Sequence, residues 1–128
     1  QPQTLPIEAY WCLPIGECIS LEIANTNQEK QIGLMFRKNF SKRRGIWFQY
    51  TSPQIVNIWM KNTLIPLDLI FISNSVIVHI EENIPICSSL KCKSYGPDFP
   101  VDGVIEVIAG EVKRMGINKG DYFNVKSY

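Results

Sequence analysis

The stretch that decides the fold is Trp-Met-Lys-Asn-Thr-Leu-Ile-Pro-Leu-Asp-Leu-Ile-Phe-Ile-Ser, residues 59–73. Its second half is an almost unbroken apolar run, which predicts a buried strand over 67–72. Pro66 cannot donate to a β ladder, so it marks a bend between this strand and a shorter extended segment over 58–60. Asp68 is the one carboxylate inside the run. A carboxylate among isoleucines needs a cation, several N–H donors or a proton.

The segments on either side of this stretch predict more strands than helices. Alternating or aromatic-rich patterns predict strands at residues 19–24, 46–50, 76–81, 104–108 and 122–125. Thr26 with Glu29 three residues later forms a capping box, and it predicts a helix of about three turns. Ile32, Met35 and Phe36 would form the apolar stripe of that helix. A second helical turn is predicted from Glu111 to Met115, with Gly116 in the left-handed position after it.

This order of elements predicts a mainly β, α+β fold. A parallel wound sheet needs a helix between successive strands, and most of these connections are too short to hold one. We therefore expect a curved antiparallel sheet or small barrel with one or two short helices packed on it. The 128 residues fit one domain. Three prolines in residues 1–17 indicate an irregular N-terminal arm over 1–18, followed by a single domain over 19–128.

Composition and charge exclude some functions. The formal net charge is +1, so no field from the whole domain would steer it to nucleic acid or to an anionic membrane. No apolar run approaches the ~20 residues of a membrane span. The basic stretch 37–44 is typical of a solvated loop, with an anion or lipid contact as the sharper alternative. Since there is no second basic cluster, we expect no nucleic-acid partner, and nothing in the sequence calls for a cofactor.

The four cysteines fall into two local pairs, Cys12 with Cys18 and Cys87 with Cys92. Neither pair has the spacing of a zinc site, and His79 lies far from both in sequence, so we expect no metal. Disulfides and buried free thiols both remain open. The pairs Cys12–Cys18 and Cys87–Cys92 are favoured because each closes a short loop, and they would place the protein in an oxidising compartment. Because the chain begins at Gln1, we expect a preceding signal or anchor to have been removed.

Several segments together resemble the DUF192 (UPF0127) family of small prokaryotic proteins. They are Gly33-Leu34-Met35-Phe36-Arg37, Gly45-Ile46-Trp47-Phe48, Trp59-Met60-Lys61-Asn62-Thr63 with Ile65-Pro66-Leu67-Asp68, Val107-Ile108-Ala109-Gly110 and Lys119-Gly120-Asp121. The resemblance implies a compact β-rich domain, often exported or held behind a signal or membrane anchor, and it implies no known activity. The chain departs from the family at residues 45–48, where Gly-Met-Leu-Phe is usual, and the cysteines look like an addition.

The polar residues of the central stretch suggest a site. If residues 57–63 are extended, the side chains of Trp59, Lys61 and Thr63 share one face. Our leading hypothesis is an exported, non-enzymatic domain that binds a sugar-like or carboxylate ligand, or an envelope component, at the mouth of the barrel. The candidate ligand-binding residues are Arg37, Trp59, Lys61, Asn62, Thr63 and Asp68. Alternatively Asp68 is structural, paired with Lys61 or Arg37 or accepting backbone N–H bonds.

Two further functions stay open. Asp68 and Lys61 could act as the acid and base of a hydrolase or lyase, which would need Asp68 open to a cleft. The domain could instead be a scaffold that presents loop 37–44 or loop 83–103 to a protein partner. No Ser–His–Asp order, nucleophile elbow or phosphate loop occurs in the sequence, which favours binding over catalysis.

Overall fold

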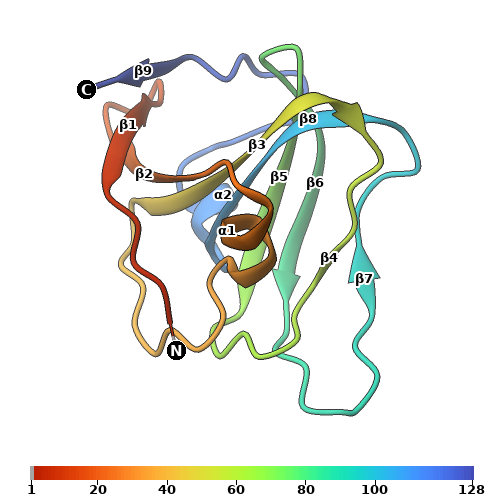
Figure 1. The fold of residues 1–128 in the computed structure, drawn as a ribbon. Helices are drawn as coiled ribbons and strands as arrows, with labels where there is room; N and C mark the ends of the chain where they lie inside the picture. The colour runs from red at the N-terminus through yellow and green to blue at the C-terminus, as the bar shows by residue number, and fades with distance from the viewer. Residues whose placement is uncertain (1) are drawn as a thin grey trace.

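The structure is a computed structural model that describes residues 2–128. Those residues form a strongly β-rich domain with two short helices (Figure 1). In chain order the elements are β1 (Ile7–Cys12), β2 (Cys18–Ala24), α1 (Asn27–Ile32), β3 (Arg44–Gln54), β4 (Ile58–Trp59), β5 (Leu67–Ser73), β6 (Val76–Ile84), β7 (Ser94–Tyr95), β8 (Val101–Ile108), α2 (Glu111–Arg114) and β9 (Val125–Ser127).

Seven strands form one curved sheet in the order β6-β5-β8-β3-β2-β1-β9, and β4 pairs separately with β7. The expected β-rich fold with a curved sheet is confirmed. The sheet is not closed into a barrel, because the two edge strands β6 and β9 do not pair within residues 2–128. An isolated bridge between Val76 and Tyr122, with backbone hydrogen bonds that join residues 75–77 to residues 120–123, spans that gap.

One strand pair in the sheet is parallel. β2 runs parallel to β3, whereas the other neighbouring pairs are antiparallel, so the sheet is mixed. The reason is the connection through α1, which is long enough to carry the chain back to the starting edge of the sheet.

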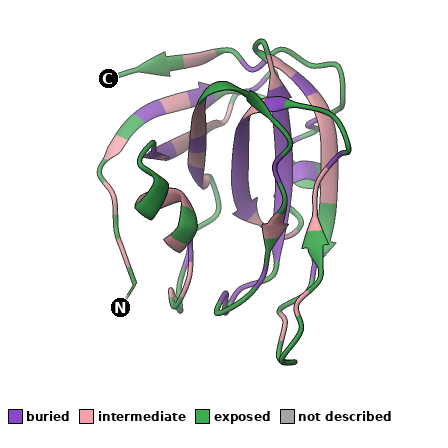
Figure 2. Cartoon of the chain, turned by 45° about the vertical axis from the view of Figure 1, so that its right-hand side comes forward, coloured by how far each residue is buried: buried purple, intermediate pink, exposed green. Residues whose placement is uncertain are grey.

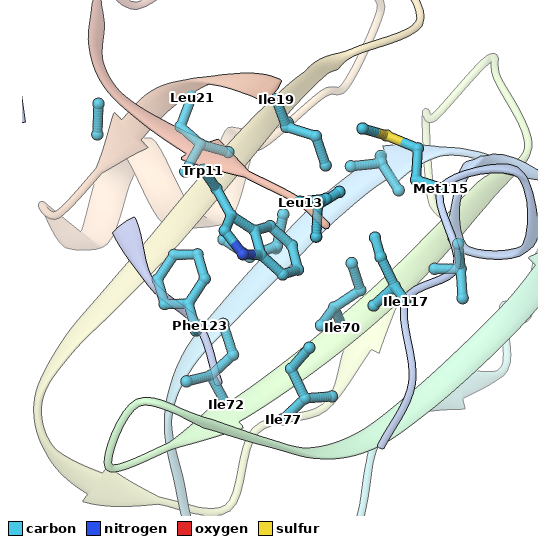
Figure 3. Packing of buried hydrophobic residues seen from close by; sticks show 14 residues of the cluster. Trp11, Leu13, Ile19, Leu21, Ile70, Ile72, Ile77, Met115, Ile117 and Phe123 are labelled. Atoms are coloured by element: carbon cyan, nitrogen blue, oxygen red, sulfur yellow. The ribbon is translucent and has the colours of Figure 1, made fainter. Parts of the chain in front are cut away.

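The curvature of the sheet gives it two buried faces. On one face β5 contributes Ile70 and Ile72, which pack with Trp11 and Phe123 (Figure 3). The rings of Trp11 and Phe123 meet edge to face at 5.1 Å. On the other face β5 contributes the alternate residues Leu67, Leu69 and Phe71, which pack with residues of β3, β8 and the loops. β5 is therefore buried on both sides, as its unbroken apolar run requires (Figure 2).

The N-terminal segment was expected to be irregular, and that expectation is wrong for Ile7–Cys12. This segment forms β1, which pairs with both β2 and β9. Ala9 and Trp11 alternate with more exposed neighbours and are buried in the core. The two disulfides have the favoured pairing, and Cys12–Cys18 closes the β1–β2 hairpin directly.

Two other predicted boundaries are also wrong. The capping box of Thr26 and Glu29 is present, but α1 has only six residues because Gly33 ends it at a φ of 50°. Leu34, beyond the helix, is buried instead of a helical stripe, and Phe36 is exposed. The last strand begins at Val125 rather than Tyr122, since Phe123 turns into the core. Loop 83–103 contains the short strand β7.

No helix within residues 2–128 has both the length and the apolar character needed to cross a bilayer.

Candidate functional site

Asp68 is sealed inside the protein. Its side chain is fully buried and accepts three backbone N–H bonds, from Asn83 at 2.8 Å and from Gly110 and Val112 at 3.0 Å each. These bonds tie β5 to β6 on one side and to the start of α2 on the other. Asp68 therefore has the structural role that the sequence suggested as an alternative, in which its carboxylate accepts backbone N–H bonds. Its burial removes the acid–base mechanism built on Asp68 and Lys61, because no substrate can reach the carboxylate.

Arg37 does not approach Asp68. Its guanidinium lies 2.9 Å from both carboxylate oxygens of Glu22, and Arg44 donates to the same carboxylate at 2.8 Å. The backbone N–H of Leu5 adds a fourth bond to Glu22, at 3.1 Å. Glu22 is fully buried on β2, so Arg37 serves to neutralise a core carboxylate.

The remaining motif residues form a turn at one end of the sheet. Asn62 has a φ of 58°, and its carbonyl accepts the N–H of Phe36 at 2.8 Å. The ammonium of Lys61 lies 5.1 Å from the ring centroid of Trp59, whose side chain is half-exposed. Thr63 is buried and donates weakly to the carbonyl of Lys61 at 3.4 Å. The six predicted site residues therefore do not converge at one point.

Two of them, Trp59 and Thr63, line a cavity of about 290 Å³ between α1 and the sheet. The helix side is formed by α1 and the turn after it, including Lys30 and Gly33. The sheet side includes the rings of Phe48 and Tyr50 from β3. Asn57 adds an amide from the segment before β4. One carboxyl group, that of Glu106 on β8, also lines the cavity.

Glu106 is the unusual group in this cavity. Only 4% of the residue is exposed, yet no donor within residues 2–128 forms a hydrogen bond with its carboxyl group. Burial raises the pKa of Glu106 from 4.5 to about 8. At neutral pH the group is therefore mostly a neutral carboxylic acid, which can both donate and accept a hydrogen bond.

The neighbours of Glu106 keep it apart from cations. Lys30 donates to the carbonyl of Gln49 at 2.8 Å and stands 4.2 Å above the ring of Tyr50. Burial, and to a lesser degree the charge of Glu106, raises the pKa of Tyr50 to about 12, so its hydroxyl is neutral as well. Gly33 lies close to two other residues that line the cavity. A Cβ at that position would lie 3.0 Å from Phe48 Cζ and 3.7 Å from Glu106 Oε1.

The sequence did contain a signal for Glu106. It alternates with Val104 and Ile108 on one face of a strand whose other face is apolar, which marks a carboxyl group pointing into a core. Glu22 has no such signal, because Leu21 and Ile23 lie on the opposite face of the strand and its own face carries Ser20 and Ala24.

The fold and the cavity define a small disulfide-bonded domain built on an open, curved β-sheet, with one uncompensated acid facing a small cavity. The chain belongs to the DUF192 family, since the family model, described as an uncharacterized ACR, matches residues 14–125. This confirms the resemblance seen in the sequence. The comparison with curated proteins found no match.

Two solved structures are similar over almost the whole chain. One is described as "a putative transcription regulator" from Sinorhizobium meliloti 1021; it is 29% identical, has a TM-score of 0.81, and the match covers 99% of this chain and 98% of that one. The other is a protein of unknown function from Novosphingobium aromaticivorans DSM 12444. It is 28% identical with a TM-score of 0.81, and the match covers 98% and 92% of the two chains.

Proposed function

We propose that this domain binds a small, neutral, sugar-like ligand in the cavity beside Glu106. The observation that carries the proposal is a buried carboxyl group without a hydrogen-bond partner that faces a cavity rather than packed hydrocarbon. Its oxygens keep a small accessible area, so a ligand hydroxyl in the cavity can supply the hydrogen-bond partner that the described residues do not.

The chemistry around the cavity matches a hydroxyl-rich ring. A protonated Glu106 offers one donor and one acceptor, and the amide of Asn57, which also lines the cavity, offers both. Trp59 and Tyr50 supply aromatic faces of the kind on which the apolar side of a sugar ring packs. A volume of about 290 Å³ suits a ligand of monosaccharide size.

The same chemistry argues against a carboxylate ligand at this cavity. The cation in the cavity lining is Lys30, whose ammonium is already engaged by the Gln49 carbonyl and the Tyr50 ring. Arg37 is held by Glu22, so a ligand carboxylate would find no dedicated guanidinium partner there. Of the two ligand classes considered for the central stretch, the neutral sugar-like class is therefore better supported.

The proposed setting is outside the cytosol, in the periplasm or cell envelope. The Cys12–Cys18 and Cys87–Cys92 disulfides are compatible with an oxidising, exported location. Both disulfides close short loops, and a reducing compartment would convert them to free thiols.

A thermal-shift screen followed by calorimetry tests the binding proposal. Neutral monosaccharides and polyols form one panel and small organic acids form the contrast panel, at about pH 6 where Glu106 is protonated. We expect at least one neutral sugar to bind and Glu106→Leu to weaken it about tenfold or more. Trp59→Ala should also weaken it, while Phe99→Ala, a similarly exposed aromatic outside the cavity, should not. Binding of organic acids alone, or full binding by Glu106→Leu, would contradict the proposal.

A further inference from the structure

The loops at one end of the sheet have a charge balance unlike that of the whole chain. They are residues 33–43 between α1 and β3, residues 60–66 between β4 and β5, and residues 85–93 between β6 and β7. Figure 1 shows all three along the lower edge of the molecule. Together they carry seven cations and no acidic residue, although the chain as a whole has a net charge of only +1.

The lysines among these cations are free of ion pairs. Arg37 and Arg43 contact Glu22 and Glu17 respectively, but the lysines form no salt bridge within residues 2–128. Three exposed lysines, Lys61, Lys91 and Lys93, belong to the two neighbouring loops 60–66 and 85–93. Because salt screens charges beyond ~10 Å, acids on the far side of the molecule contribute little to the field at these lysines.

The same end carries half of the large apolar side chains that the protein exposes. Leu90 is fully exposed at the tip of loop 85–93, and Ile86 and Leu64 are each about half-exposed. Phe36 is also exposed, and Trp59 immediately precedes loop 60–66. Exposed leucine, isoleucine and aromatic side chains interleaved with lysines are typical of proteins that lie on an anionic interface.

The loops are held together as one surface. The Phe36 N–H donates to the Asn62 carbonyl, which joins the first loop to the second. Trp59, Lys61 and Leu90 border one shared hollow, which joins the second loop to the third. The Cys87–Cys92 disulfide closes the third loop directly around Leu90. The disulfide thus restricts the conformations of the turn that carries Leu90, and this reduces the conformational entropy that the loop loses on docking.

From this arrangement we propose that the end formed by loops 33–43, 60–66 and 85–93 docks on an anionic lipid surface. Leu90, Ile86 and Leu64 enter the headgroup region, and Trp59 lies at its boundary, where indole rings are favoured. Lys61, Lys91 and Lys93 contact lipid phosphates. The lysines separate this proposal from the ligand in the Glu106 cavity, because none of them lines that cavity, whereas Trp59 borders both places.

Vesicle co-sedimentation of the oxidised protein tests it. The vesicles contain phosphatidylcholine alone or phosphatidylcholine with phosphatidylglycerol. We expect binding to the anionic vesicles only, with release at high salt. Replacing Lys61, Lys91 and Lys93 together by Gln should weaken binding roughly 100-fold, at about fivefold for each lysine. The matched control replaces three exposed lysines outside the loops, Lys113, Lys119 and Lys126, and should change binding far less.

The apolar part is tested by Leu90→Asp, which should abolish sedimentation while leaving the melting temperature unchanged, since Leu90 packs against nothing. A blue shift of indole fluorescence on binding, absent in Trp59→Phe, would report the boundary position of that ring. Equal loss in the two lysine triples, binding to neutral vesicles as strong as to anionic ones, or binding to polyglutamate without binding to vesicles would overturn the proposal. The last result would point to an acidic protein partner instead.

Discussion

Glu22 and Glu106 occupy equivalent places in the sheet and have opposite surroundings. Glu22 on β2 and Glu106 on β8 are both register partners of Ile46 on the strand between them, β3. The two glutamates therefore flank the same residue on the same buried face of the sheet. Glu22 receives two guanidinium groups and one backbone N–H. Glu106 receives no hydrogen bond from the described residues and faces the cavity.

The difference shows that burial of an acid is not by itself a functional signal. A paired acid such as Glu22 is part of the core, because each oxygen has a donor and the charge is compensated. An unpaired acid beside a cavity destabilises the fold, and a ligand could offset that cost. The contrast between the two glutamates can be tested by changing each in turn.

The largest effect is expected from Glu22→Gln. Removing the negative charge leaves Arg37, whose side chain is only 11% exposed, facing Arg44 without a counterion. Breaking a buried pair in this way should lower the free energy of unfolding by about 4 kcal/mol. Urea unfolding at about pH 7 measures it, with Glu106→Gln as the matched control on the same face. A Glu22→Gln protein as stable as the wild type would mean that the arginines lie in water rather than in the core.

The next effect concerns the pH dependence that Glu106 imposes on stability. Below about pH 4.5 the carboxyl group is protonated in both the folded and the unfolded protein, so it contributes no difference. Between pH 4.5 and about 8 the folded protein keeps a proton that the unfolded chain has released. The free energy of unfolding therefore falls as pH rises through this window, and the loss levels off above about 8.

Glu106→Gln should lack this contribution. Between about pH 4.5 and about pH 7 the wild type should lose up to roughly 3 kcal/mol more stability than the variant. Urea titrations of both proteins across this range give the difference directly, and other titrating groups cancel in the comparison. Parallel curves for the two proteins would show that Glu106 is solvated or paired in solution.

A third carboxylate separates charge compensation from hydrogen bonding. Asp68 is as buried as Glu22 but is held by three backbone N–H groups rather than by cations. Asp68→Asn keeps the shape but replaces one accepting oxygen by an NH2 group, so at least one N–H donor loses its partner. We expect a loss of about 2 kcal/mol, smaller than for Glu22→Gln. Increased amide hydrogen exchange at Gly110 and Val112 would locate the effect at α2. If Asp68→Asn lowers the free energy of unfolding more than Glu22→Gln does, the predicted order of the two effects is wrong.

The sequence could predict the sheet but not the partners of its buried acids. Alternating patterns identified β2 and β6, and apolar or aromatic runs identified β3, β5 and β8, because burial of one or both faces of a strand leaves such patterns whatever the partner strand is. They could not show that Arg37 reaches Glu22, since that contact depends on how the loop after Gly33 folds back. Asp68 was identified as needing donors, but the donors are backbone groups of α2 and β6, which residue types do not encode. The parallel β2–β3 pair was missed for a related reason: strand direction depends on the whole connection through α1.

The smallest effect tests how firmly the cavity is shaped around Glu106. Gly33 has a φ of 50°, and an added Cβ would lie 3.0 Å from Phe48 Cζ. Gly116 also has a positive φ, 67°, but nothing lies within 4 Å of its Cβ position. Gly33→Ala should cost more than Gly116→Ala for two reasons: the ψ of −125° at Gly33 lies outside the left-handed region that alanine tolerates, and Phe48 must move.

The difference in stability between the two alanine variants combines the extra backbone strain at Gly33 with the stiffness of the cavity wall. If Gly33→Ala is clearly less stable than Gly116→Ala, movement of the wall does not relieve the strain and the contact with Phe48, and the methyl group narrows the space beside Glu106 Oε1. In that case the variant should also weaken any ligand that Glu106 binds. If the two variants unfold at the same urea concentration, the wall yields easily. A wall that moves so easily would let water reach Glu106. The two glutamates would then differ only in that arginines compensate the charge of Glu22.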